Sequence, residues 1–174
     1  MTRLLPAAAP AWTITAVSYD SPSARALTRA LHSEQVATYG KADDPATTPV
    51  AEFEPPGGVF LVAGLPDGTA LACGGWRTVG STTAEVKRMY VTPAARGQGL
   101  GRGILQALEQ DARHHGKTEV LLETGVSNHA ALALYTRCGY ALVDPYVSGR
   151  DPRINRALSK TLSSQTEGQQ PRAV

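Results

Sequence analysis

A glycine-rich turn between a β-rich run and a helix-like run is the feature that most constrains how this chain can fold. Residues 91–101 read VTPAARGQGLG; the run at 83–91 before them favours a strand, and the run after them repeats apolar residues at helical spacing until Gly116. Glycine lets backbone N–H groups approach an anion, and a helix N-terminus contributes about half a positive charge. The turn therefore predicts a site for a phosphate or pyrophosphate group.

Two better-known glycine loops do not fit this segment. No register gives the G-x-G-x-x-G pattern of dinucleotide-binding proteins, and the Gly116-Lys117-Thr118 triplet lacks the glycine at position 111 that a P-loop needs. A lone loop of this kind is a tight turn about as often as it is an anion site, so a second motif has to decide.

Periodicity and turn residues predict one α/β domain with the element order βα-βββ-α-β-α-ββ. Strands are predicted at 12–19, 59–63, 69–76, 83–91, 119–123, 140–143 and 155–161, and helices from a cap at Asp20 or Ser21 to Gly40, from the glycine turn to Gly116, and at 128–138. The apolar side of the second helix consists of Leu100, Ile104, Leu105, Leu108 and Ala112. The connection at 41–58 carries four prolines and is long for a compact domain, which makes it a candidate substrate lid.

Composition and charge bound the classes of function. Of 174 residues, 42% are hydrophobic and 18% charged, which fits a single domain at 12–162 with a flexible segment at 1–11 and a disordered tail at 163–174. A net charge of +2 gives no reason to expect nucleic acid, and no apolar run reaches the length of about 18 residues that indicates a membrane span. Cys73 and Cys138 are expected to be buried free thiols in a cytoplasmic protein. The adjacent His114 and His115, splayed toward water, predict no metal site.

Two segments resemble the GNAT superfamily of N-acetyltransferases. Arg96-Gly97-Gln98-Gly99-Leu100-Gly101 matches that family's R/Q-x-x-G-x-G/A loop for the pyrophosphate of coenzyme A, and the lead-in at 85–91 resembles its central strand. Downstream, residues 128–140, NHAALALYTRCGY, resemble its N-x-x-A-x-x-L-Y-x-x-x-G-F/Y segment. The resemblance is strong over 84–141 and implies an α/β fold of the α+β type: a mixed, mostly antiparallel central sheet flanked by helices, with a splayed pair of central strands.

The resemblance also implies a coenzyme A site. Its residues would be Met89, Val91, Arg96, Gly97, Gln98, Gly99, Leu100, Gly101 and Asn128. In the family, the pantetheine arm fills the gap between the splayed strands, here 83–91 and 121–123, and pairs with backbone groups such as those of Met89 and Val91. Asn128 would hydrogen-bond the same arm. For the side chains of Met89 and Val91, packing in the core is the preferred interpretation.

Two residues are candidates for catalysis. Glu85 lies eleven residues before Arg96, where resemblance to the histone-acetylating branch of the family places a glutamate general base. Tyr135 shares a helix face with Asn128 and would protonate the departing sulfur. A backbone N–H near Met89 would polarise the acetyl carbonyl. The structural alternatives stay open: Glu85 as a solvated strand residue, and Tyr135 as a packing aromatic.

The activity that the resemblance implies is transfer of an acetyl group from acetyl coenzyme A to a primary amine, by direct attack in a ternary complex and without a metal. The acceptor is left open between a small amine or amino acid, an antibiotic and a protein amine, with contacts from the first helix, 41–58 and 144–156. A homodimer is left open as well. The alternative is a catalytically silent module that binds or senses acyl coenzyme A, which would need neither Glu85 nor Tyr135.

Overall fold

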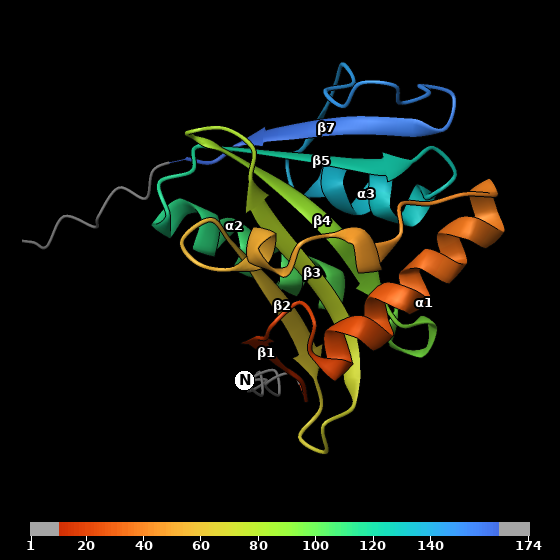
Figure 1. Cartoon of the computed structure of the whole chain (residues 1–174), viewed down its shortest axis with the longest axis vertical. Helices are drawn as coiled ribbons and strands as arrows, with labels where there is room; N and C mark the ends of the chain where they lie inside the picture. Colours follow the sequence, from red (N-terminus) through yellow and green to blue (C-terminus); the bar gives the residue numbers. More distant parts are fainter. Residues whose placement is uncertain (1–10, 164–174) are drawn as a thin grey trace, which may run out of the picture.

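The computed structural model describes residues 11–163, which form a seven-stranded sheet with helices on both faces (Figure 1). Apart from their innermost positions, the predicted flexible segment at 1–11 and tail at 163–174 lie outside the described residues. The strands are β1 (Thr13–Ala16), β2 (Gly58–Gly64), β3 (Ala70–Thr78), β4 (Thr83–Val91), β5 (Glu119–Gly125), β6 (Ala141–Val143) and β7 (Asn155–Thr161). Their order is β1-β2-β3-β4-β5-β7-β6, and only β4 and β5 are parallel neighbours, so the mixed, mostly antiparallel sheet is confirmed.

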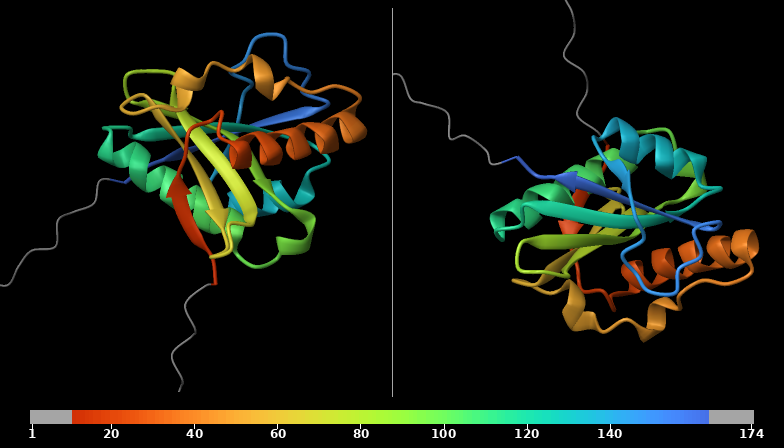
Figure 2. Two further views of the ribbon diagram at one scale, coloured as in Figure 1. Left: turned by 60° about the horizontal axis from the view of Figure 1, so that its bottom comes forward. Right: turned by 90° about the horizontal axis from the view of Figure 1, so that it is seen from above.

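Three α-helices cover the sheet: α1 (Pro22–Tyr39), α2 (Leu100–His114) and α3 (His129–Arg137). α1 and two short 3-10 segments, Pro45–Thr47 and Val50–Phe53, lie on one face, and α2 and α3 lie on the other (Figure 2). A third 3-10 segment, Pro93–Ala95, precedes the glycine turn. The predicted order of helices and strands is therefore confirmed. Within residues 11–163, no helix is both long and apolar enough to cross a membrane.

Local chemistry explains where α1 begins and ends. Ser21 caps its start, because its Oγ accepts a hydrogen bond from the Ala24 N–H at 3.3 Å. Gly40 ends it at φ +78°, a left-handed conformation that is accessible to glycine at little cost. β1 is shorter than the predicted strand at 12–19 because the chain turns at Ser18, whose carbonyl accepts from the Ser21 N–H. Tyr19, expected at the end of the strand, packs in the core instead.

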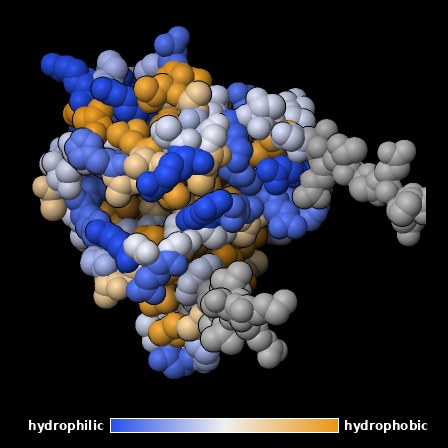
Figure 3. All heavy atoms as spheres, turned by 180° about the vertical axis from the view of Figure 1, so that it is seen from behind, coloured by the Kyte–Doolittle hydropathy of each residue, from blue (hydrophilic) through white to orange (hydrophobic). Residues whose placement is uncertain are grey.

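Two apolar clusters hold the helices against the sheet. The predicted apolar side of α2 is buried in one of them, as Leu100, Ile104, Leu105, Leu108 and Ala112. The outer sides of α2 and α3 belong to the face seen in Figure 3, where hydrophilic and hydrophobic side chains are interspersed. In the other cluster, α1 and the 41–58 connection pack around the rings of Tyr19, Phe53 and Phe60, whose centroids lie 4.8 to 5.5 Å apart.

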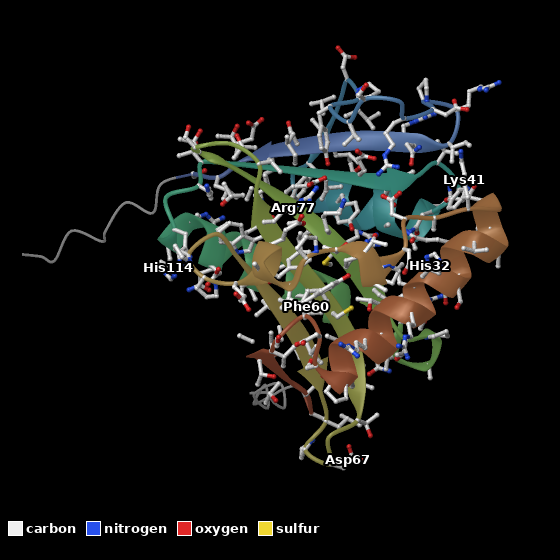
Figure 4. The ribbon with its side chains drawn as sticks, in the orientation of Figure 1. His32, Lys41, Phe60, Asp67, Arg77 and His114 are labelled. Carbon is white, nitrogen blue, oxygen red and sulfur yellow. The ribbon has the colours of Figure 1, made fainter. Side chains whose placement is uncertain are left out.

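The two cysteines and the two adjacent histidines singled out in the sequence lie in different surroundings. Cys73 and Cys138 are free thiols, as predicted, but Cys73 is buried as expected whereas Cys138 is only half-buried. His114 is exposed near the end of α2 (Figure 4), whereas His115 is half-buried and its ring centroid lies 5.7 Å from that of Trp76. Only His114 fully faces water, so the expectation for His115 was wrong.

β4 and β5 stay paired only over their first halves. Partner positions run from Thr83 and Glu119 to Val86 and Leu122, after which β4 and β5 continue without pairing to each other. The predicted splay is therefore confirmed, although it opens at Glu123 rather than at Leu121.

A bulge distorts β4 on its other side, where it pairs with β3. The register shifts between Cys73 and Gly75, and Arg88 has φ +61°, which is costly for a residue with a side chain. The Cys73 thiol donates a hydrogen bond to the Arg88 carbonyl at 3.3 Å and so helps to hold this conformation. The bulge lies one residue before Met89, close to the expected position.

Candidate active site

The glycine turn leads from the end of β4 into the first turn of α2. Gly97 has φ +78° and Gly99 has φ +84°, and a Cβ at either position would meet no atom within 4 Å. Backbone conformation, rather than crowding, therefore requires glycine here, and the space in front of the turn is open. Gly101 differs, because a Cβ there would lie 3.2 Å from the side chain of Leu134 on α3, which would have to shift slightly.

Arg96, predicted to contact a pyrophosphate, is engaged by the protein itself. Its Nη2 lies 2.7 and 2.9 Å from the two carboxylate oxygens of Glu34 on α1, and its Nε donates to the Val91 carbonyl at 3.0 Å. Its guanidinium also lies over the Tyr90 ring. The turn is thus tied to α1 by a contact between residues 62 positions apart, which sequence patterns did not indicate.

Met89, Val91 and Asn128, also predicted to bind the coenzyme, have different surroundings. The side chains of Met89 and Val91 pack against the core, as preferred from the sequence. Asn128 is exposed and caps α3, since its Oδ1 accepts from the Ala131 N–H at 3.1 Å. Its amide Nδ2 is the group left to donate to a ligand.

Tyr135 is 4% exposed, and its ring centroid lies 5.8 Å from that of Tyr140. Burial raises the pKa of Tyr135 above its usual value, so the phenol stays neutral at physiological pH. The residue packs in the core, but its position in the same helix as Asn128 is as predicted.

Glu85 is a buried carboxylate rather than a solvated strand residue, with 2% of its surface exposed. Arg77 donates from Nε to Oε2 at 2.8 Å, and Tyr146 donates from its hydroxyl to Oε1 at 3.0 Å. Arg77, labelled in Figure 4, also pairs with Glu52. Both oxygens of Glu85 therefore already accept hydrogen bonds.

A cavity of about 320 Å³ opens on the α1 face of the sheet, where β4 and β5 part. It is lined by the second half of α1, residues 41–43, residues 85–88 of β4, residues 123–125 of β5, and residues 149–151, 154 and 155. Lys41 marks its edge, beyond the end of α1 in Figure 4. The first helix, 41–58 and 144–156 are the segments from which acceptor contacts were predicted, whereas the contributions of β4 and β5 to this cavity were not predicted. A second cavity of about 440 Å³ is lined by polar side chains of α2 with Arg137, Cys138 and Lys160, away from the splay.

Glu123 is a cavity residue that sequence reasoning missed. It is the first residue of β5 beyond the pairing with β4, and Arg150 Nε lies 3.0 Å from its Oε2. Its Oε1 is buried and accepts no hydrogen bond from any group within residues 11–163. Burial raises the pKa of the Glu123 carboxyl, and this effect outweighs the opposing effect of Arg150. The signal available in the sequence was only an acidic residue at the end of a predicted strand.

A known family combines this sheet with this turn. The family model described as "Acetyltransferase (GNAT) family" matches residues 25–140. The chain belongs to this family. The match includes most of α1, the glycine turn and both splayed strands, β4 and β5, of this GNAT protein.

Its relatives support the same assignment. The IAA acetyltransferase of Azospirillum brasilense is 44% identical over 96 residues, which make up 53% of this chain and 61% of that protein. A protein of Klebsiella pneumoniae described as a candidate acyl-CoA N-acyltransferase is 32% identical, with a TM-score of 0.75 over 87% of this chain and 98% of that one. The protein yncA of Salmonella typhimurium, solved with its cofactor acetyl-CoA, shares the fold at 20% identity, with a TM-score of 0.62 over 90% of this chain and 97% of that one.

Proposed function

We propose that this GNAT protein transfers an acetyl group from acetyl coenzyme A to a primary amine by direct attack, in a complex that holds both substrates. The observation that carries the proposal is that three features occur together along β4: an open glycine turn at its end, a gap between β4 and β5, and a cavity with carboxylates on the α1 face. Residues 96–101 would bind the pyrophosphate. The backbone of Met89 and Val91, with Asn128, would hold the pantetheine arm.

The neutral amine nitrogen forms a bond to the acetyl carbon, the carbon–sulfur bond breaks, and the extra proton then carried by the nitrogen is taken up by the departing thiolate, giving an acetamide and coenzyme A. An alkyl ammonium has a pKa near about 10, so it has to lose a proton before attack. Tyr135 would donate a hydrogen bond to the departing sulfur. Because burial raises its pKa further above the thiol value of about 8.5, this hydrogen bond is more favourable than full transfer of the phenolic proton.

Two carboxylates are candidates for the proton acceptor. Glu85, the candidate from the sequence, has both oxygens engaged by Arg77 and Tyr146. Glu123 has one oxygen without a partner and a pKa raised by burial, which brings its proton affinity closer to that of an amine. We therefore favour Glu123 as the group that receives the proton. Glu85, held by Arg77 and Tyr146, would keep its negative charge in a fixed position in the same cavity.

A turnover assay tests the proposed function. Acetyl coenzyme A and a panel of amino acids, peptides, polyamines and aminoglycosides should release free coenzyme A with at least one amine, in amounts matched by an acetylated product in mass spectra. Acetyl coenzyme A should also raise the melting temperature, whereas NAD and ATP should not. Stabilisation without any turnover would favour the silent binding module, and no stabilisation would contradict the cofactor.

Gly99→Val is expected to weaken coenzyme A binding. The backbone at φ +84° disfavours a β-branched side chain, and that side chain would project from the turn where the pyrophosphate is expected. Calorimetry on the folded variant should show a loss of affinity of at least about tenfold, similar to removing one charge-assisted hydrogen bond. The matched control is Gly68→Val, at φ +89° in the distant β2–β3 turn, which should leave affinity unchanged. Equal affinities for both variants would make the glycine turn purely structural.

Glu34→Gln is expected to strengthen coenzyme A binding. The Glu34 carboxylate holds Arg96, which would have to leave this pair or share its charge to contact a pyrophosphate. The two side chains are 44% and 49% exposed, and exposed pairs contribute about 0.2 to 1 kcal/mol, so the gain should be about 1.5- to 5-fold in affinity. Calorimetry measures the affinity of Glu34→Gln for coenzyme A. Glu54→Gln, the same charge change at another exposed position, is the control and should leave the affinity unchanged. Weaker binding in Glu34→Gln would instead mean that Glu34 holds Arg96 in the position that coenzyme A needs.

A further inference from the structure

The charges that line the cavity at the splay are balanced in number. Four are acidic, Asp43, Glu85, Glu123 and Asp151, and four are basic, Lys41, Lys87, Arg88 and Arg150. An acceptor with several ammonium groups would need an excess of acidic side chains to bind here. The balance instead suits a ligand that itself carries both signs of charge.

Most of these charges are already neutralised by neighbours. Arg150 lies 2.7 Å from Asp43 and 3.0 Å from Glu123. Asp151 pairs with Arg153 at 3.0 Å. These contacts hold the cavity walls together and leave few groups for a ligand.

One carboxylate oxygen beside the splayed strands has no hydrogen-bond partner within residues 11–163. Glu123 Oε1 is buried without a hydrogen bond, and a buried acceptor without a donor costs free energy. A ligand ammonium would supply that donor. Glu123 is also the first residue of β5 beyond its pairing with β4, so an amine bound there would lie beside the gap between the strands.

Two cationic groups are left on β4, in the wall of the same cavity as this oxygen. The closest carboxylate to the Lys87 ammonium is Glu85, at 3.9 Å, too long for a hydrogen bond. Among the residues that the structure describes, Arg88 donates only to neutral groups, the Asp43 carbonyl at 3.2 Å and the Thr48 hydroxyl at 3.1 Å, and its buried Nε has no partner there. Lys87 and Arg88 both line the cavity, and the bulge at Arg88, with φ +61°, lies at the point where two consecutive residues of β4 reach the α1 face.

We propose that the acceptor is a small amino acid-type molecule, with a carboxylate near its primary amine. The carboxylate binds Lys87 and Arg88 on β4, and the amine binds Glu123 on β5, at the mouth of the splay. This assignment rests on the proposed function and narrows its acceptor. It excludes polycationic antibiotics, whose additional ammonium groups would meet Lys87 and Arg88, and peptide N-termini, which lack a carboxylate next to the amine.

Paired acceptors test the assignment. Initial rates are measured with acetyl coenzyme A and each free amino acid beside its amide, which keeps the side chain and removes the carboxylate charge. The wild type should show a higher kcat/KM for the acids. Lys87→Met should lower kcat/KM for the acids by about 10- to 100-fold, the range of a lost hydrogen bond between charged groups, and should leave the amides nearly unchanged.

Lys41→Met is the matched control, because Lys41 is an exposed lysine at the edge of the same cavity. It should change the acid-to-amide ratio less than twofold, since exposed charges are screened. Equal losses of kcat/KM for the acids in both lysine variants would mean that the cavity attracts the carboxylate only by its general positive charge, and would overturn the proposed carboxylate site. Faster turnover of amides, peptides or aminoglycosides than of acids would overturn the acceptor class while leaving acetyl transfer standing. No turnover with any amine would overturn the proposed function as well.

Discussion

Glu123→Gln is expected to lower kcat/KM by about 100- to 10,000-fold near neutral pH, the range for loss of a general base. Glutamine keeps the size of the side chain and a hydrogen-bonding group for Arg150, which also retains Asp43 as a partner. What it removes is the ability to take a proton from the ammonium. Because Glu123 lies in the acceptor cavity, the affinity for acetyl coenzyme A should be unchanged by calorimetry.

The pH dependence separates a base from a positioning group. Burial raises the pKa of Glu123, and a base works only when deprotonated, so wild-type kcat/KM should rise as pH increases through that raised pKa. In Glu123→Gln this rise should disappear. The difference in kcat/KM between the wild type and Glu123→Gln should shrink at alkaline pH, because more of the amine is already deprotonated in solution.

Glu85→Gln is the comparison variant. The change keeps hydrogen-bonding groups for Arg77 and Tyr146 but removes the charge, so we expect a smaller loss that is independent of pH. A large loss in Glu85→Gln that shrinks at alkaline pH, together with near wild-type activity in Glu123→Gln, would return the role of base to Glu85, as the sequence suggested.

The sequence was sufficient for the parts of the site that depend on local chemistry. The glycine turn, the caps at Ser21 and Gly40 and the buried side of α2 follow from backbone preferences and periodicity within one segment. The splay was also predicted, but through resemblance to a family, because nothing in the composition of β4 or β5 states how far they stay paired.

The acceptor side depends on contacts between distant segments, which periodicity does not encode. The Glu34–Arg96 pair joins positions 62 residues apart, and Arg150 reaches Asp43 across 107 residues. Glu123 lines the cavity at the point where pairing between β4 and β5 stops, after Leu122, and nothing in the sequence marks that point. Likewise, consecutive residues on a strand normally face opposite sides, so Lys87 and Arg88 could not be assigned to one cavity without the bulge.

Tyr135→Phe is expected to lower kcat by about 10- to 1,000-fold, around the range for losing a group that assists the leaving thiol. The ring is buried in the core and phenylalanine fills the same volume, so the fold and the affinity for acetyl coenzyme A should be retained. The hydroxyl acts only as sulfur acquires negative charge, and its loss should therefore appear in kcat rather than in KM. Single-turnover rates measure this step directly.

Tyr140→Phe controls for the loss of a buried hydroxyl in the same cluster. Tyr140 donates to Glu109 at 3.0 Å, so this variant should lose about 1 to 3 kcal/mol of stability, the cost of leaving a buried acceptor with one partner fewer. Lys160 still lies 2.8 Å from the other oxygen of Glu109, which limits that loss. Turnover should stay near wild type in Tyr140→Phe at a temperature where it is folded. If Tyr135→Phe behaves in the same way, with lower stability and unchanged single-turnover rates, then Tyr135 is a packing aromatic and the thiolate leaves without its help.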